Sequence, residues 1–156
     1  MSRLFTDVIC MQSKKGQNKP SAVPFSWAEF LSQLEKKYSG FRFVEGRKFA
    51  FRPPRTIVFN SSEKSGDLLI LHEIGHALSG HRFFGTDVER IKIEVEAWEK
   101  ARELAKLYGV EFNEDLVQEE LDTYRDWLHK KSRCPNCGLT RFQTQDSVYH
   151  CPNCDN

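Results

Sequence analysis

The chain has 156 residues, of which 39% are hydrophobic and 12% aromatic, so it can bury a core and does not belong to the disordered class. Its 23 basic and 22 acidic side chains nearly cancel, so overall charge predicts no attraction to nucleic acid or to a membrane. No apolar run approaches the roughly 18 to 20 residues that span a bilayer, and the N-terminus lacks a signal-peptide pattern. We therefore expect a cytoplasmic protein.

The N-terminal region is predicted to be a flexible arm followed by a helix. Residues 12–24 are rich in Lys, Gln, Ser, Gly and Pro, and we expect residues 1–24 to form the arm. The helix is predicted to start at Ser26, because Glu29 stands three residues further on and completes a capping box. Gly40 follows its expected end.

Alternating residues then predict strands. Residues 41–51 place four Phe side chains on one face and Arg on the other, with Gly46 between the halves, which predicts a β-hairpin with one buried face. Pro53 and Pro54 end this segment, and residues 55–60, RTIVFN, form a predicted third strand. We therefore expect an α+β fold, in which a small antiparallel sheet packs on helices.

Two later helices are marked by their capping residues. Thr86 and Glu89 form a capping box at the start of one helix, and Gly109 stands at its end. Asn113 caps a further amphipathic helix. We expect residues 25–131 to form one domain that contains these helices and strands.

The stretch LLILHEIGHALSGH, residues 68–81, contains the pattern His-Glu-x-x-His. On a helix, His72 and His76 lie one turn apart on the same side and can bind one zinc ion, with Glu73 beside them to accept a proton from water. Gly75 is expected to keep the helix surface small near the site. The opposite side is apolar and should pack into the core through Ile70, Leu71, Ile74, Ala77 and Leu78.

Catalytic zinc needs a third protein ligand. His81 comes at an expected helix end, so we interpret it as an ordinary loop residue, and Glu96 has the twenty-residue spacing from His76 that is found in thermolysin-like enzymes. Glu94, however, projects from the apolar face of its helix, whereas Glu96 projects among charged residues. A buried carboxylate is costly unless it is paired or coordinated, so Glu94 is the expected ligand. The alternative for Glu94 is a buried salt bridge with Arg102 or with an arginine of the sheet.

The C-terminal module, residues 132–156, contains two Cys-Pro-Asn-Cys knuckles separated by thirteen residues. Four thiolates in this pattern bind one tetrahedral metal, which predicts a zinc ribbon with a structural zinc ion. The expected ligands are Cys134, Cys137, Cys151 and Cys154. The ribbon is a candidate contact site for nucleic acid or a protein partner, or a stabilising module. Cys10 is left over and is interpreted as a bystander.

The strand TIVFN, a short loop, LLILHEIGHALSGH and a helix containing EVEA together resemble the ImmA/IrrE family of small cytoplasmic metallopeptidases and, more broadly, the gluzincins. The resemblance covers about residues 25–108. It implies that the first Glu of EVEA, Glu94, is the third zinc ligand, and that the protein cleaves a specific protein target, in that family often a DNA-binding repressor. Where the family has Asn or Asp after this motif, the chain has Trp98.

The predicted function is that of a zinc-dependent metalloprotease with two zinc ions, one catalytic and one structural, and with no membrane contact. Glu73 is expected to act as general base and then to protonate the leaving amine. Strand 55–60 is a candidate to pair with an extended substrate. The oxyanion-stabilising donor stays open among four residues: His81, Arg102, Tyr108 and Tyr124.

Two other functions fit the same motifs. A SprT-like protease that acts on DNA-bound proteins also combines His-Glu-x-x-His with a C-terminal ribbon, but it requires His81 as the third ligand. A non-catalytic regulator would keep the zinc helix as structure and use the ribbon to bind DNA or a partner. A Glu73→Gln variant separates an enzyme from such a regulator, because only the enzyme loses its function.

Overall fold

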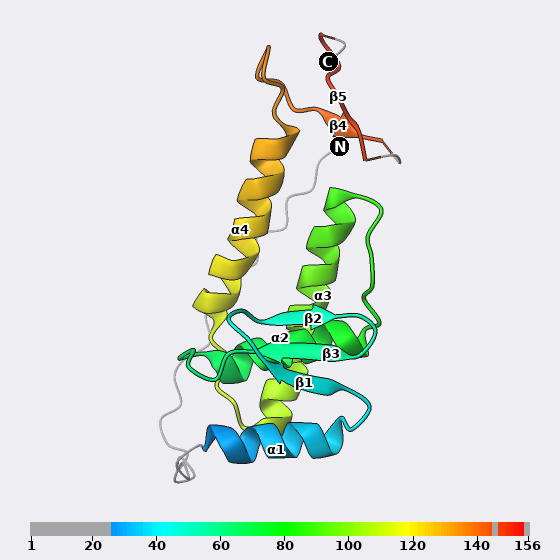
Figure 1. Ribbon diagram of the computed structural model, residues 1–156. Coiled ribbons are helices and arrows are strands. Elements are labelled where there is room, and N and C mark those ends of the chain that lie inside the picture. The colour runs from blue at the N-terminus through cyan, green and yellow to red at the C-terminus, as the bar shows by residue number, and fades with distance from the viewer. Residues whose placement is uncertain (1–25, 145–146, 155–156) are drawn as a thin grey trace, which may run out of the picture.

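The computed structural model describes residues 26–144 and 147–154, so the predicted arm, residues 1–24, and Cys10 lie outside the described residues. The elements are α1 Trp27–Lys37, β1 Arg42–Glu45, β2 Ala50–Arg52, β3 Thr56–Phe59, α2 Gly66–Leu78, α3 Asp87–Tyr108, α4 Glu114–Ser132, β4 Phe142–Gln143 and β5 Tyr149–His150 (Figure 1). These helices and two small sheets confirm the α+β class. Within the described ranges, no helix has the length and apolar character needed to cross a bilayer.

The larger sheet has the strand order β1-β3-β2, with β3 parallel to β1 and antiparallel to β2. The predicted hairpin is therefore wrong, since β3 lies between the two segments, and the sheet is mixed rather than antiparallel. The reason is burial: in β3, Ile57 is 0% exposed and Phe59 is 5% exposed, and a strand this apolar is stabilised most in the centre of the sheet. The four Phe residues nevertheless share the predicted inward face and pack against the core: Phe41, Phe43, Phe49 and Phe51.

The core lies between the sheet and the helices. In Figure 1 the sheet covers α2, and α1 closes the lower end of the molecule. The largest fully buried side chains come from α1, β3 and α2: Leu34, Ile57, Leu68, Ile70, Leu71 and Ile74. Leu78 differs from expectation, because it stands at the last position of α2 and is 44% exposed.

The predicted capping residues set the ends of the long helices. Thr86 and Glu89 form both hydrogen bonds of a capping box at the start of α3, and Gly109 ends that helix with a left-handed φ of 68°. At the start of α4, the Asn113 side chain accepts a hydrogen bond from a backbone N–H. Helix α1 also begins as predicted, at Ser26, although it ends before Gly40.

Close packing of α2 on α3 depends on Gly75. A Cβ atom at this position would lie 2.5 Å from the carbonyl oxygen of Ala97, so only glycine permits the two helices to approach this closely. Gly75 thus keeps the surface of α2 small where α3 packs on it. The close approach places α3 within reach of the histidines on α2.

The C-terminal module docks on the first turn of α3 through Asp87. The Asp87 carboxylate accepts a hydrogen bond of 2.7 Å from the Tyr149 hydroxyl and forms an ion pair of 2.7 Å with Lys131. Its backbone N–H donates to the side chain of Gln143. Asp87 is 5% exposed. Its contacts with Tyr149 and Gln143 join the module to α3, and its ion pair with Lys131 joins α3 to the end of α4.

Candidate metal sites

Helices α2 and α3 bring three predicted ligands together. The Nε2 atoms of His72 and His76 lie 3.1 Å apart, and each lies 3.3 Å from Oε2 of Glu94. Glu94 is 8% exposed, whereas the side chain of Glu96 is 65% exposed, as the helical periodicity predicts. The alternative salt bridge to Arg102 does not form, because Arg102 pairs with the exposed Glu114.

The separations within this triangle fit a bound metal ion. Tetrahedral zinc with ligand distances of about 2.0 to 2.1 Å places its ligand atoms about 3.3 to 3.4 Å apart. Two imidazoles and one carboxylate form the donor set of a catalytic zinc site, which keeps a fourth position for water or substrate. The three residues can therefore hold a metal ion.

The protonation states of the ligands also suit a cation. Burial raises the pKa of Glu94, but hydrogen bonds and charge interactions with His72 and His76 outweigh it, so the pKa lies near 2. Burial lowers the pKa of His72, although Glu94 opposes the shift. An ionised carboxylate beside a neutral imidazole is the state in which both bind a metal.

Glu73 stays outside the triangle and faces the same cleft. Its Oε2 accepts a hydrogen bond of 2.5 Å from the backbone N–H of Phe51, in strand β2. Burial raises the pKa of Glu73 to about 7, while His76 and the Phe51 N–H oppose the shift. A carboxylate with this pKa can both accept and release a proton near neutral pH.

The structure also assigns contacts to His81 that the sequence did not predict. His81 Nδ1 lies 3.0 Å from His76 Nδ1, and His81 Nε2 lies 3.1 Å from Glu96 Oε2. A metal on His76 Nε2 leaves the proton on Nδ1, which then donates to His81, and His81 in turn donates to Glu96. His81 and Glu96, both candidates for the third ligand, therefore lie outside the triangle: His81 contacts His76, and Glu96 contacts only His81 in this chain of contacts.

His72 is held from its other side by stacking. Its ring lies 4.1 Å from that of Trp98, with 27° between the planes. Among the described residues, His72 Nδ1 has no hydrogen-bond partner. On this side of the ring, packing by Trp98 takes the place of a hydrogen bond to Nδ1.

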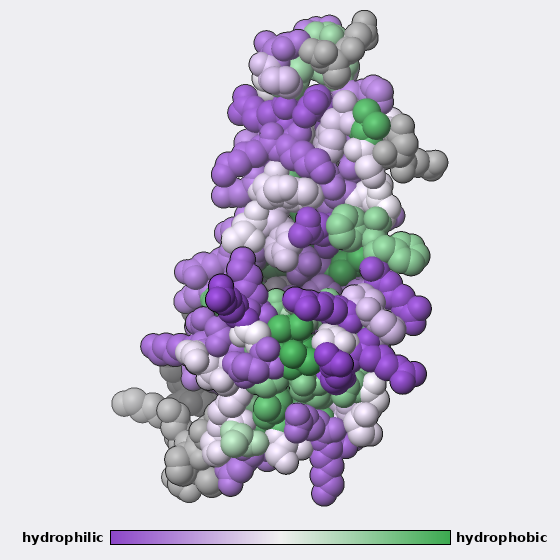
Figure 2. All heavy atoms as spheres, viewed as in Figure 1, coloured by the Kyte–Doolittle hydropathy of each residue, from purple (hydrophilic) through white to green (hydrophobic). Residues whose placement is uncertain are grey.

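A cleft of about 340 Å³ opens over the triangle, between β2, α2, α3, α4 and the α2–α3 loop. Its rim is aromatic where the loop carries Phe83, which is 86% exposed, and Phe84, which is 45% exposed. Figure 2 shows hydrophobic side chains protruding over this loop, whereas most of the same face is hydrophilic. Tyr124 lines the cleft from α4, and burial together with the charge of Glu94 raises its pKa to about 12.

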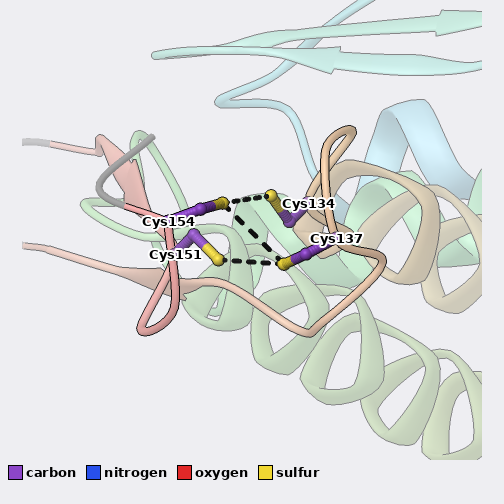
Figure 3. Close-up of side chains that lie close together, drawn as sticks. All are labelled: Cys134, Cys137, Cys151 and Cys154. Atoms are coloured by element: carbon purple, nitrogen blue, oxygen red, sulfur yellow. Dashed lines mark hydrogen bonds between the residues drawn. The ribbon is translucent and has the colours of Figure 1, made fainter.

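The four cysteines of the C-terminal module converge on one point (Figure 3). The Sγ atoms of Cys134 and Cys154 lie 3.4 Å apart, as do those of Cys137 and Cys151, and Cys137 lies 3.8 Å from Cys154. Tetrahedral zinc with Zn–S distances of about 2.3 Å separates its sulfurs by about 3.8 Å. Backbone N–H groups of Cys137 and Asn136 lower the pKa of Cys134 to about 6, which favours the metal-binding thiolate. These four residues can hold a second metal ion.

Comparisons of the chain with protein-family models, with curated proteins and with solved structures found no significant match.

Proposed function

We propose that the chain is a zinc metallopeptidase of the gluzincin type, similar to the ImmA/IrrE family, which cleaves a specific protein target in the cytoplasm. The observation that supports this proposal is the placement of a buried His72–His76–Glu94 triangle beside Glu73 in one open cleft. A purely structural metal site uses four protein ligands and has no need of a cleft or of a neighbouring base.

Glu73 is the proposed general base. Its pKa of about 7 lets it take a proton from the attacking water, and it then gives this proton to the amine as the C–N bond breaks. A bound zinc ion would supply the Lewis acidity that polarises the carbonyl and lowers the pKa of water to roughly 7. His72, His76 and Glu94 would hold that ion.

Tyr124 is the proposed oxyanion-stabilising donor among the four candidates. Its raised pKa of about 12 keeps the phenol protonated, so that it can donate a hydrogen bond in the cleft. Both ring nitrogens of His81 are engaged, and Arg102 is paired with Glu114. Tyr108 packs edge-on against Phe30 instead.

Strand β2 is the proposed partner of an extended substrate, in place of strand 55–60. That segment forms β3 and is paired on both sides, so it has no free edge. Strand β2 is an edge strand, and Ala50 and Phe51 line the cleft. A peptide added along β2 would pass the triangle with its backbone extended.

The contacts of His81 argue against the SprT-like alternative, because its two ring nitrogens face His76 and Glu96 rather than the centre of the triangle. For the ribbon, the contacts of Asp87 favour a stabilising role.

The test begins with metal content by mass spectrometry on the full chain and two matched variants. We expect two zinc ions in the unmodified protein and in Glu96→Ala, but only one in Glu94→Ala. Of the two glutamates, Glu94 belongs to the triangle and Glu96 does not. One ion in all three proteins would contradict the proposal.

Peptide cleavage is then measured on a library of protein-derived peptides. Glu73→Gln should keep both zinc ions and lose cleavage. A Glu73→Gln variant that keeps every activity of the protein would make the chain a non-catalytic regulator.

A further inference from the structure

Arg90 is an arginine of the cleft that the proposed chemistry does not use. It lies in the first turns of α3 and lines the cleft together with the metal triangle. Its guanidinium carbon lies 5.4 Å from the ring centre of Phe84, 5.3 Å from that of Tyr124 and 5.0 Å from that of Trp127. Aromatic rings from the α2–α3 loop and from α4 thus hold this side chain in place.

The charge of Arg90 has no carboxylate partner within the part of the chain that the structure describes. Arg102, Arg125 and Lys131 all pair with acidic side chains there, but no carboxylate lies within 4.0 Å of the Arg90 guanidinium. Its N–H groups make no hydrogen bond to the described residues, and they are not among the buried atoms that lack one. They can therefore be reached from the cleft.

Rings and anions use different parts of a guanidinium. Aromatic rings interact with its flat faces, whereas the five N–H donors point outward in its plane and fit a carboxylate with two parallel hydrogen bonds. A cation that is held by rings and whose N–H groups have no partner among the described residues can thus bind a planar anion.

The position of Arg90 sets where such an anion would lie. Arg90 precedes Glu94 by one helical turn on the same face, a spacing of about 5 to 6 Å between Cβ atoms. An extended peptide advances about 3.3 Å per residue. A carboxylate on Arg90 would therefore belong to a residue one or two positions from the group held at the metal triangle.

We propose that Arg90 recognises a substrate carboxylate on a residue within two positions of the scissile bond. This inference rests on the proposed peptidase function. The carboxylate is either an acidic side chain or the C-terminus of a peptide, and both offer the same planar anion to the same donors.

The test uses zinc-loaded full-length protein and three ligands. Each is a malonyl hydroxamate, which chelates zinc, coupled to glycinamide, to glycine or to aspartic acid α-amide, and affinities are measured by calorimetry. We expect at least one of the two acids to bind about 10- to 100-fold more tightly than the neutral amide. The preferred acid identifies a terminal or a side-chain carboxylate.

Variants assign the preference to one residue. Arg90→Gln should abolish it and leave the affinity for the neutral amide within about 2-fold, which also shows that the cleft is intact. Arg82→Gln, which removes the same charge from the rim of the same cleft, should keep it. Arg90→Lys keeps the charge but loses the two-pronged geometry, and should reduce the preference to about a tenth. Equal affinities for all three ligands, or a preference lost in Arg82→Gln instead, would overturn the proposal.

A second measurement does not depend on the metal. Acetylglycine, acetyl-aspartic acid α-amide and acetylglycinamide are titrated into metal-free protein, and the Nε–H resonance of Arg90, identified by its absence in Arg90→Lys, is followed by NMR. At least one acid should shift it saturably, and the neutral amide should not. If no hydroxamate binds the zinc-loaded protein while the acid still shifts Arg90, the peptidase proposal fails and the Arg90 assignment stands. If neither acid shifts the resonance, the assignment is wrong.

Discussion

Removing His81 should weaken metal binding at the His72–His76–Glu94 triangle, although His81 does not belong to the triangle. His81 is only 10% exposed at its side chain, so a His81→Ala variant leaves the Nδ1 proton of His76 without an acceptor in a largely dry place. Metal-free His76 can change tautomer or rotate, whereas metal-loaded His76 cannot. The unpaired Nδ1 proton therefore destabilises the metal-loaded state more than the metal-free state, which lowers the metal affinity.

The structure predicts a ranking of magnitudes. Leaving a buried donor unpaired costs about 1 to 3 kcal/mol, which is about 5- to 150-fold in metal affinity. Glu96 is 65% exposed, so water replaces most of its contact and Glu96→Gln should cost less than about 5-fold. Glu99→Gln removes the same charge from an exposed position of the same helix that has no contact with the site, and should leave affinity unchanged within about 1.5-fold.

The assay is competition for zinc against a chromophoric chelator, supported by the visible spectrum of the cobalt-loaded protein. His81→Gln provides a rescue, because its amide oxygen can accept the proton of His76. We expect the largest loss of zinc affinity in His81→Ala, smaller losses in His81→Gln and Glu96→Gln, and the smallest loss in Glu99→Gln. An affinity unchanged in His81→Ala would refute the positioning role, and equal losses in Glu96→Gln and Glu99→Gln would show that only long-range charge matters.

The remaining predictions concern stability. Gly75→Ala should lower the free energy of unfolding by about 1 to 3 kcal/mol, because its Cβ would lie 2.5 Å from the carbonyl oxygen of Ala97. The control is Gly40→Ala, where a Cβ meets nothing within 4 Å. Chemical denaturation measures the free energy of unfolding of both variants. In the metal-free protein, Glu73→Gln should raise the free energy of unfolding at pH 8 by up to about 3 kcal/mol and at pH 5 by less than about 1 kcal/mol. The folded-state pKa of Glu73, about 7, lies above its ordinary value of 4.5, so ionising Glu73 destabilises the folded state as the pH rises through this range. An equal gain in the free energy of unfolding at both pH values would contradict this. Asp87→Asn removes the charge that docks the C-terminal module, and should cost about 1 to 3 kcal/mol and speed hydrogen exchange in that module; unchanged exchange would mean that other contacts hold it.

The features that the sequence predicted depend on neighbours along the chain. Thr86, Glu89 and Gly109 act within one helical turn of the ends of α3, so their pattern is sufficient to place that helix. The burial of Glu94 follows from the periodicity of the same helix. Helix capping and helical periodicity do not predict which residues of other segments a side chain contacts.

The features that the sequence missed are pairings between segments. The alternation of residues 41–51 indicates strands with one buried face, but a hairpin and an inserted third strand satisfy that pattern equally well. His81 and Glu96 share no helical face or motif. They meet because the α2–α3 loop runs alongside α3 (Figure 1). A histidine beyond the end of a metal-binding helix is therefore better tested against the acidic residues of the next helix than treated as an ordinary loop residue.

The shortness of β2 limits what its backbone can recognise. The strand has three residues, Ala50–Arg52, and is followed by Pro53 and Pro54, which offer no N–H donors. Alternate residues of an antiparallel strand point their backbone groups away from the partner strand, and Phe51 does so here, since its N–H reaches Glu73. So few open backbone groups give a second copy of the chain little to pair with, which protects this edge from aggregation. A substrate of the proposed peptidase would also gain little from them, so under that proposal its selection would depend on the side chains around the cleft.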